Sequence, residues 1–218
     1  MTDASLGQYA ANLSLDYRPF PELESYASDS RIPIIHADAM AHIQQLITLH
    51  SSLKILEIGT AIGYSAMMMA RMSPQIHVVT IERDEDMASA ARHNIRKYGY
   101  QTQVEIMSGD ALQLDQEVGC MAPFDLLFID AAKGQYGSFF DLYTPMLKAG
   151  GLVITDNVFF RGFVTQADED IPKRFRRIVH KLRTFNQELS LNPYYQTVFL
   201  TVGDGLAVSL KLGKDFRT

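Results

Sequence analysis

Two carboxylates, an amide and a lysine stand where two apolar runs of the chain end. Asp130 closes one run, and Lys133 lies three residues beyond it. Asp156 and Asn157 close the next run along the chain. Oxygen ligands without His or Cys suit a hard cation such as Mg2+, which keeps waters or substrate oxygens at its remaining positions. A lysine near such a cation loses its proton more easily, so Lys133 is a candidate general base; loop capping by Asp and Asn beside a surface lysine is the alternative.

A glycine-bearing turn closes an earlier apolar run and reads EIGTAIGYS over residues 57–65. Gly59 and Gly63 in such a turn let a ligand approach backbone N–H groups closely. Their spacing departs from the G-x-G-x-x-G of dinucleotide sites, so the turn favours a ligand without phosphates, such as S-adenosylmethionine. A tight strand-to-helix turn that binds nothing is the alternative.

Acidic residues close two further runs. Glu82 lies 19 positions beyond Gly63, where a carboxylate accepts hydrogen bonds from ribose hydroxyls, whether of a nicotinamide cofactor or of an adenosylated sulfonium. Asp110, in the segment SGDA, can accept a hydrogen bond from an adenine amino group. It can equally cap a helix that begins at Ala111, and the two roles are compatible.

Hydrophobic periodicity predicts the elements that position these residues. The predicted strands are near-continuous apolar runs, typical of strands covered on both faces: Lys54–Ile58, Ile76–Ile81, Val104–Met107, Phe124–Ile129 and Leu152–Thr155. The predicted helices are His36–His50, Tyr64–Met72, Asp84–Tyr98, Ala111–Val118 and Tyr136–Leu147. Strands joined by helices imply right-handed crossovers and a parallel, doubly wound α/β sheet, with its ligand site at the carboxyl ends of the strands.

The end of the chain departs from this alternation. The stretches Tyr195–Val202 and Leu206–Leu212 are strand-like, and the turn Gly203-Asp204-Gly205 joins them. This pattern predicts a hairpin whose second arm runs antiparallel to its neighbour. We therefore expect a mostly parallel, seven-stranded sheet with a C-terminal antiparallel hairpin.

The composition is typical of a soluble globular chain. It has 218 residues, 47% hydrophobic and 21% charged, with a net charge of -5. This length favours one domain, and the charge excludes nucleic-acid binding over the whole surface. Because no apolar stretch approaches the ~20 residues of a membrane span and the start lacks a signal sequence, we expect a cytoplasmic protein. Cys120, the only cysteine, excludes an internal disulfide and is expected to be a small buried hydrophobe.

Five motifs occur in a characteristic order: LEIGTAIGYSA, TIERD, GDA, FIDAAKGQY and TDNVFFRG. Jointly, from about Pro33 to Gly205, they resemble the cation-dependent O-methyltransferases, the family of catechol and caffeoyl-CoA methyltransferases. The longer segments PFDLLFIDAAKGQYGSFFDLYTPML and YQTVFLTVGDGLAVS resemble the bacterial tRNA 5-hydroxyuridine methyltransferases, which make 5-methoxyuridine at the wobble position. The resemblance implies a Rossmann-like methyltransferase fold over residues 1–218 and a homodimer. In this domain residues 1–50 form a helical segment that covers the site, and residues 51–218 form the core.

The resemblance also implies roles for individual residues. The metal ligands fall on Asp130, Asp156 and Asn157, for Mg2+ or another divalent cation such as Mn2+, and the catalytic residues are Lys133 and Asp130. The contacts to S-adenosyl-L-methionine fall on Ile35, Glu57, Gly59, Ser65, Glu82, Asp110, Ala111 and Asp130. One feature departs from the animal catechol enzymes, which place a tryptophan directly before the catalytic lysine. Ala132 stands there and the chain has no tryptophan, so a phenolic ring would lose its clamp.

The substrate must offer two adjacent oxygens if it is to chelate the cation. A catechol has such a pair, and 5-hydroxyuridine has one in its 5-hydroxyl and 4-carbonyl groups. The segment Lys173–Arg183 favours the nucleic acid, because it holds six of the 20 Lys and Arg residues and no acid. The predicted contacts to the tRNA anticodon loop are Arg161, Lys173, Arg174, Arg176, Arg177 and Lys181. A solvated helix face that compensates Asp168–Asp170 is the alternative.

Three functions are compatible with these sequence features. The first is methylation of tRNA wobble 5-hydroxyuridine, and the second is methylation of small phenolics by the same chemistry. The third is a non-enzymatic module that binds an adenosyl ligand or RNA. The complete set of two carboxylates, amide and lysine argues against the third.

Overall fold

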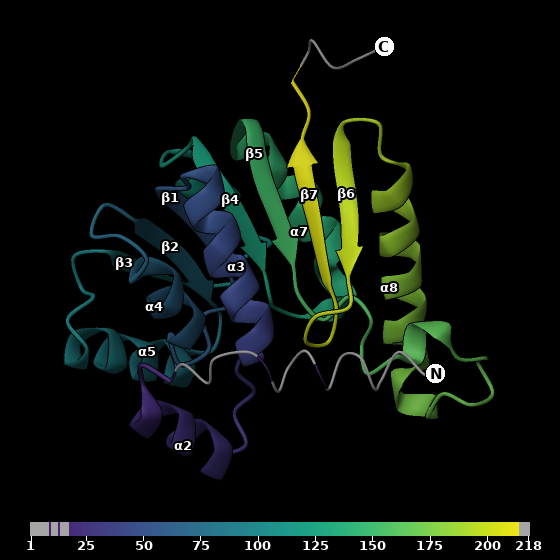
Figure 1. Ribbon diagram of the computed structural model, residues 1–218, viewed down its shortest axis with the longest axis horizontal. Coiled ribbons are helices and arrows are strands. Elements are labelled where there is room, and N and C mark those ends of the chain that lie inside the picture. Colours follow the sequence, from purple (N-terminus) through teal and green to yellow (C-terminus); the bar gives the residue numbers. More distant parts are fainter. Residues whose placement is uncertain (1–8, 10–12, 14–17, 214–218) are drawn as a thin grey trace.

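A sheet of seven strands with helices on both faces makes up the computed structural model, which describes residues 9, 13 and 18–213 (Figure 1). The strands are β1 (Lys54–Ile58), β2 (His77–Glu82), β3 (Val104–Ser108), β4 (Phe124–Ile129), β5 (Leu147–Thr155), β6 (Tyr195–Leu200) and β7 (Leu206–Lys211). The helices are α2 (Pro21–Asp29), α3 (Ala37–His50), α4 (Tyr64–Ala70), α5 (Glu85–Lys97), α6 (Asp115–Gly119), α7 (Tyr136–Tyr143) and α8 (Lys173–Leu191). Short 3-10 turns are η1 (Lys133–Gln135), η2 (Thr144–Met146) and η3 (Phe163–Thr165). No helix of the described residues is both long and apolar enough to cross a bilayer.

The strand order is β3-β2-β1-β4-β5-β7-β6. Strands β1 to β5 pair in parallel, whereas β7 is antiparallel to both β5 and β6. The predicted fold class, a mostly parallel seven-stranded α/β sheet with a C-terminal antiparallel hairpin, is confirmed. Strand order reverses between β1 and β4, where Ile58 pairs with Ile129, and Ile129 pairs in turn with Thr155 of β5. The polar residues after these strands therefore meet at one edge of the sheet, at the topological switch point.

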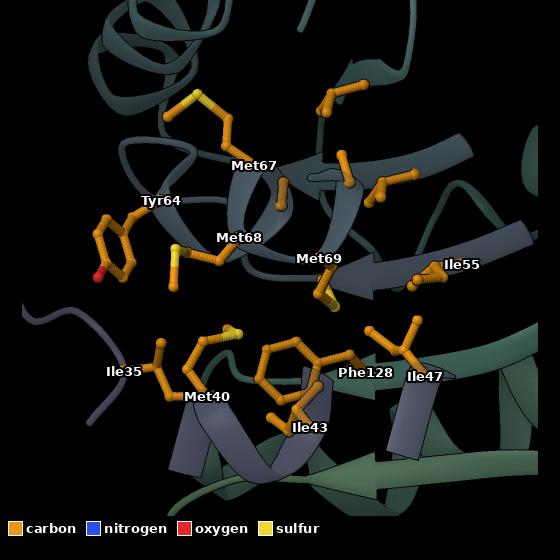
Figure 2. Packing of buried hydrophobic residues seen from close by; sticks show 14 of the residues in the cluster. Ile35, Met40, Ile43, Ile47, Ile55, Tyr64, Met67, Met68, Met69 and Phe128 are labelled. Carbon is orange, nitrogen blue, oxygen red and sulfur yellow. The ribbon is translucent and has the colours of Figure 1, made fainter. Parts of the chain in front are cut away.

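Two apolar cores lie on the two faces of the sheet, because successive strand residues point to opposite sides. Ile55 belongs to the core under α3 and α4, and Leu56 to the core under α7 and α8. Figure 2 shows the first core, where Met40 of α3 and Met68 of α4 point toward each other. Both helices are thereby fixed against the strands whose carboxyl ends carry the polar residues.

Hydrophobic periodicity does not predict helix α2, because the start of the chain is polar and interrupted by proline; only the resemblance implies a helical segment there. Pro21 begins this helix, at a position where its missing N–H costs nothing. Phe20 anchors the segment, with its ring centroid 4.8 Å from that of Tyr98. The chain between α2 and α3 then crosses the carboxyl edge of the sheet, where residues 33–36 line a cavity.

Two predicted helices are shorter than expected. The helix predicted from Ala111 begins only at Asp115, because Asp110 Oδ1 accepts the Leu112 N–H (2.9 Å) and holds the preceding residues in a turn. Asp110 is therefore not the N-cap of α6. The helix predicted over Tyr136–Leu147 ends at Tyr143 because Pro145 follows in η2, and β5 begins at Leu147 rather than at Leu152.

The expected burial of Cys120 is wrong. The residue is exposed at the end of α6, where its Sγ lies 3.4 Å from the Gln116 carbonyl oxygen. The one-turn helix α6 buries only Val118. Composition alone could not indicate which side of so short a helix faces the core.

Candidate active site

Two adjoining cavities lie at the carboxyl ends of the parallel strands. Their volumes are about 530 Å³ and about 250 Å³. The two share four lining residues, Gly59, Ala61, Asp130 and Ala131. The larger one is also lined by Ile35, Ser65, Lys133, Asp156, Asn157, Phe160, Arg161 and Asp204, and the smaller one by Glu82, Arg83, Asp110, Ala111 and Phe139. The fold thus brings most of the predicted site residues to one place.

Gly59 lets the ends of β1 and β4 approach each other. It has φ of +104°, and a Cβ at this position would lie 2.2 Å from the carbonyl oxygen of Asp130. No other residue type fits there without moving one of the two strands. The turn after β1 is therefore pressed against the segment that carries Asp130.

Glu82 ties this turn to the end of β2. Its Oε2 accepts the Ala61 N–H (2.8 Å) and its Oε1 accepts the Asp84 N–H (2.9 Å). Ala61 has a left-handed φ of 45°, and the hydrogen bond that its N–H donates to Glu82 stabilises this conformation. The carboxylate still faces the smaller cavity together with Asp110 and Ala111. Carboxylates at either side of a cavity of this size suit the hydroxyls of a ribose and the amino group of a purine.

The oxygen ligands predicted for a cation line the larger cavity. Asp156 is almost fully buried, and its Oδ1 accepts the N–H of Asn157 (2.6 Å). Its Oδ2 is buried without a hydrogen-bond partner in the described part of the chain. Burial, together with the nearby charge of Asp130, raises the pKa of Asp156 to about 7. Burial also raises the pKa of Asp130, while the charge of Lys133 opposes that rise.

These residues fit a divalent cation. Two poorly solvated carboxylates beside one cavity repel each other, and the buried Oδ2 of Asp156 has no hydrogen-bond partner among the described residues. The described residues contain no cluster of three His, Cys, Asp or Glu that could hold a metal. The set therefore depends on the amide oxygen of Asn157, to which Lys133 Nζ donates a hydrogen bond of 2.5 Å. A cation held by Asp130, Asp156 and Asn157 would have this lysine beside it.

The loop after Asn157 is held by the C-terminal hairpin. Asn157, Phe160 and Arg161 all have left-handed φ angles, a strained conformation that needs outside support. Asp204 supplies it, because its Oδ1 accepts the Arg161 N–H and its carbonyl accepts the Phe159 N–H. Asp204 was not among the predicted site residues, although it lines the larger cavity. The turn sequence Gly203-Asp204-Gly205 predicts a hairpin but carries no signal that its aspartate lines a site.

Comparison with known proteins assigns the family. Residues 23–212 match the model of a family described as O-methyltransferase. The chain belongs to this O-methyltransferase family. A Staphylococcus aureus structure provisionally named a caffeoyl-CoA O-methyltransferase is 41% identical, with a TM-score of 0.89 over 95% of this chain and 99% of that one. The Niastella koreensis catechol O-methyltransferase is 34% identical over 178 residues, 77% of each chain. A Bacillus cereus O-methyltransferase solved in complex with SAH is 28% identical, with a TM-score of 0.81 over 95% of this chain and 97% of that one.

Glu57 lies beneath the site of this O-methyltransferase and lines neither cavity. It is completely buried, and its Oε2 accepts the hydroxyl of Thr80 (2.6 Å), which is also 2.6 Å from the hydroxyl of Thr60. The cofactor contact predicted for Glu57 stays a prediction. Its pKa rises to about 7 because burial outweighs the hydrogen bonds from Ser65 and Thr80.

A pH-dependent stability follows from Glu57. Because its folded pKa of about 7 exceeds the ordinary 4.5, the folded state holds the proton more tightly, and stability falls as pH rises through that window. We expect the metal-free wild type to lose about 3 kcal/mol more unfolding free energy than Glu57→Gln between pH 4.5 and pH 8. Urea unfolding of both proteins at the two pH values measures this difference. Equal losses in the two proteins would show that Glu57 is ionised in the folded state.

The basic residues predicted to contact tRNA divide into two groups. Arg161, Arg174, Lys173 and Arg177 are exposed near the start of α8. The guanidinium carbons of Arg161 and Arg174 lie 6.0 Å and 4.6 Å from the centroid of the Phe175 ring. Arg161 also lines the larger cavity. We call these four exposed side chains the cationic rim; Arg161 connects it to the larger cavity.

The other basic side chains of α8 are used within the fold. Arg176 donates to the Ile171 and Glu169 carbonyls (3.0 and 3.2 Å), and Lys181 donates to the Gly134 carbonyl (2.8 Å). Arg183 pairs with Asp168 (2.7 Å). The pair of Arg183 and Asp168 agrees with the alternative of a helix that compensates the acidic segment, while the tRNA contacts of Arg176 and Lys181 stay predictions.

Proposed function

We propose that this O-methyltransferase uses S-adenosylmethionine and a divalent cation to methylate 5-hydroxyuridine at the wobble position of tRNA. The observation that carries the choice of substrate is the cationic rim. Arg161 and Arg174 lie over the Phe175 ring, and Arg161 also lines the larger cavity. Lys173 and Arg177 belong to the same end of α8. Arginines held on an aromatic ring present their N–H groups at fixed positions, which suits phosphates.

Relatives and cavity chemistry support the methyl donor. Structures in complex with SAH or SAM are known for the Bacillus cereus enzyme and for TomG of Streptomyces achromogenes, which is 27% identical. In this chain the smaller cavity offers Glu82 to the ribose and Asp110 to the adenine. Ser65 and Ile35, in the wall of the larger cavity, would bind the part of the donor that extends toward Asp130.

The chemistry needs an ionised substrate oxygen in line with the methyl group. A cation bound by Asp130, Asp156 and Asn157 would supply a lower pKa for the substrate hydroxyl and a template for its two adjacent oxygens. Lys133, held on Asn157, accepts the hydroxyl proton. Asp204 and the hairpin keep the loop that carries Asn157 in place.

The substrate pocket is also consistent with a base rather than a clamped phenol. Ala132 precedes Lys133, and the chain contains no tryptophan. Phe160 lines the larger cavity, and its ring centroid lies 5.4 Å from that of Phe175 on the rim. An unstacked uridine could lie near this aromatic pair while its flanking phosphates bind the rim, as single-stranded RNA loops are recognised.

Charge reversal on the rim tests the proposed substrate. We expect Arg174→Glu with Arg177→Glu to lower kcat/KM for hydroxylated tRNA about tenfold or more, since each lost phosphate contact weakens RNA binding. The affinity for S-adenosylmethionine should not change. A matched variant reverses Arg96 and Lys97 on α5, which line neither cavity, and should methylate tRNA normally. Equal loss in both variants would indicate a general charge effect and contradict the rim assignment.

Methylation of small phenolics is the second candidate, favoured by the 34% identity to the Niastella koreensis catechol enzyme. The two candidates differ in their salt dependence. The kcat/KM for tRNA should fall steeply between 50 and 200 mM salt, on the order of 10³-fold if six phosphates are contacted. The kcat/KM for free catechol should change little over the same range. Activity on catechol that matches activity on tRNA at all salt concentrations would favour the second candidate.

A further inference from the structure

Helix α8 donates two hydrogen bonds to the segments that carry Lys133 and Asn157. Lys181 Nζ donates to the carbonyl of Gly134 (2.8 Å), the residue after Lys133. Asn186 Nδ2 donates to the carbonyl of Val158 (2.9 Å), the residue after Asn157. Lys133 and Asn157 are themselves joined by the bond between Nζ and Oδ1. These contacts form a closed ring in which α8 spans the two segments.

The helix is anchored well enough to act as a fixed support. Val179, Leu182, Phe185 and Leu189 are its buried residues, and they pack under the sheet. The Phe185 ring centroid lies 5.7 Å from that of Tyr136, at the start of α7 and just beyond η1. Lys181 and Asn186 lie five residues apart, a rise of about 7.5 Å along the helix axis, so their separation is set by the helix itself.

The surroundings of Asn186 indicate that the hydrogen bond from its Nδ2 to the Val158 carbonyl has a structural role. Its Oδ1 is buried without a hydrogen-bond partner in the described residues, an arrangement that costs free energy. An apolar side chain would avoid that cost but would leave the Val158 carbonyl without its donor. The stem of Lys181 packs on the η1 turn as well, since a Cβ on Gly134 would lie 3.6 Å from Lys181 Cδ. Lys181 therefore contacts the segment after Lys133, and Asn186 contacts the segment after Asn157.

We propose that Lys181 and Asn186 are positioning residues, which set the separation of Lys133 Nζ and Asn157 Oδ1 through Gly134 and Val158. This inference depends on the proposed function, in which Lys133 acts as the base. It gives Lys181 a role other than the tRNA contact predicted from its charge. A lysine displaced by about 1 Å from the reacting oxygen loses much of its effect on the rate.

The first test measures the segments themselves. In the full, metal-free chain, Lys181→Met and Asn186→Leu should increase amide hydrogen exchange in peptides that cover residues 131–137 and 156–160. Lys173→Met is the matched control, because it removes the same charge from an exposed position of the same helix and should leave both peptides unchanged. Lys181→Arg keeps a donor and should restore protection. Unchanged exchange in Lys181→Met would overturn the proposal.

The second test measures kinetics with tRNA. Lys181→Met should lower kcat about tenfold, with less than about twofold change in KM for tRNA and in cofactor affinity. In the Lys133→Ala background the same substitution should have no further effect, because it acts through Lys133. A rise in KM without a fall in kcat would assign Lys181 to tRNA binding instead, and additive losses would show a general structural effect. Both outcomes would overturn the proposal.

The two tests separate this inference from the proposed function. If Lys133→Ala keeps wild-type kcat, Lys133 is not the base and the proposed chemistry fails, while the exchange data still decide whether α8 holds the two segments. If Lys133→Ala is inactive but Lys181→Met and Asn186→Leu retain full kcat and normal exchange, the chemistry stands and the positioning role fails.

Discussion

Lys133→Ala is expected to lower kcat for methyl transfer about 10²–10⁴-fold, the usual contribution of a positioned general base. Its amine lies 2.5 Å from the amide oxygen of Asn157, inside the cavity lined by both carboxylates. Removing it leaves the cofactor cavity intact, so affinity for S-adenosylmethionine should change less than about twofold. Single-turnover methylation at saturating cofactor and Mg2+, followed over a range of pH, measures the effect.

Lys173→Ala serves as the control for this experiment. It removes a lysine from an exposed position at the start of α8 that does not line either cavity. Its effect should appear in KM for tRNA and not in the single-turnover rate. Near-normal turnover of Lys133→Ala with an unchanged pH–rate profile would contradict the role of Lys133.

Asp156→Asn is expected to lower kcat about 10²-fold or more, because it removes one of two carboxylates that would hold the cation. Asp156 is buried, and its Oδ2 has no partner in the described residues, so the neutral amide should fold at least as well in metal-free protein. Titration with Mn2+ should show weaker binding, and EDTA should abolish turnover of the wild type. The affinity for S-adenosylmethionine without metal should be retained.

Asp86→Asn provides a matched comparison, since it makes the same change at an exposed position of α5. It should leave Mn2+ binding and turnover unchanged. Wild-type turnover that persists in EDTA would contradict the assignment of Asp130, Asp156 and Asn157 as metal ligands. So would full cation-dependent activity in Asp156→Asn.

The sequence predicts the location of the site well because parallel strands end at a common edge. The bounds of β1 and β4 agree with the apolar runs Lys54–Ile58 and Phe124–Ile129. Polar residues directly after such runs must meet at the switch point, whatever the loops do. Glu57 differs because it lies inside a strand, where side chains point alternately to the two faces. Its neighbours Leu56 and Ile58 join the core under α7 and α8, which leaves Glu57 on the opposite face, under α4.

The roles of the basic residues on α8 depend on contacts that have no periodic signal. The apolar residues of α8 recur at helical spacing, and Val179 and Leu182 among them are buried. This periodicity could not show that carbonyls of the irregular segment before α8 need donors, which Arg176 and Arg183 provide. Loop conformation decides these contacts, as it decides that Asp204 joins the site.

The most direct measurement is methylation by the purified protein with S-adenosylmethionine and Mg2+, offering tRNA that carries wobble 5-hydroxyuridine and free catechol in separate reactions. Mass spectrometry of the digested nucleosides and of the phenol identifies the product. We predict Mg2+-dependent formation of 5-methoxyuridine, at a kcat/KM well above that for catechol and lowered by charge reversal at Arg174 and Arg177. Methylated catechol without 5-methoxyuridine would contradict the tRNA assignment, and no Mg2+-dependent product from either substrate would contradict the enzymatic account as a whole.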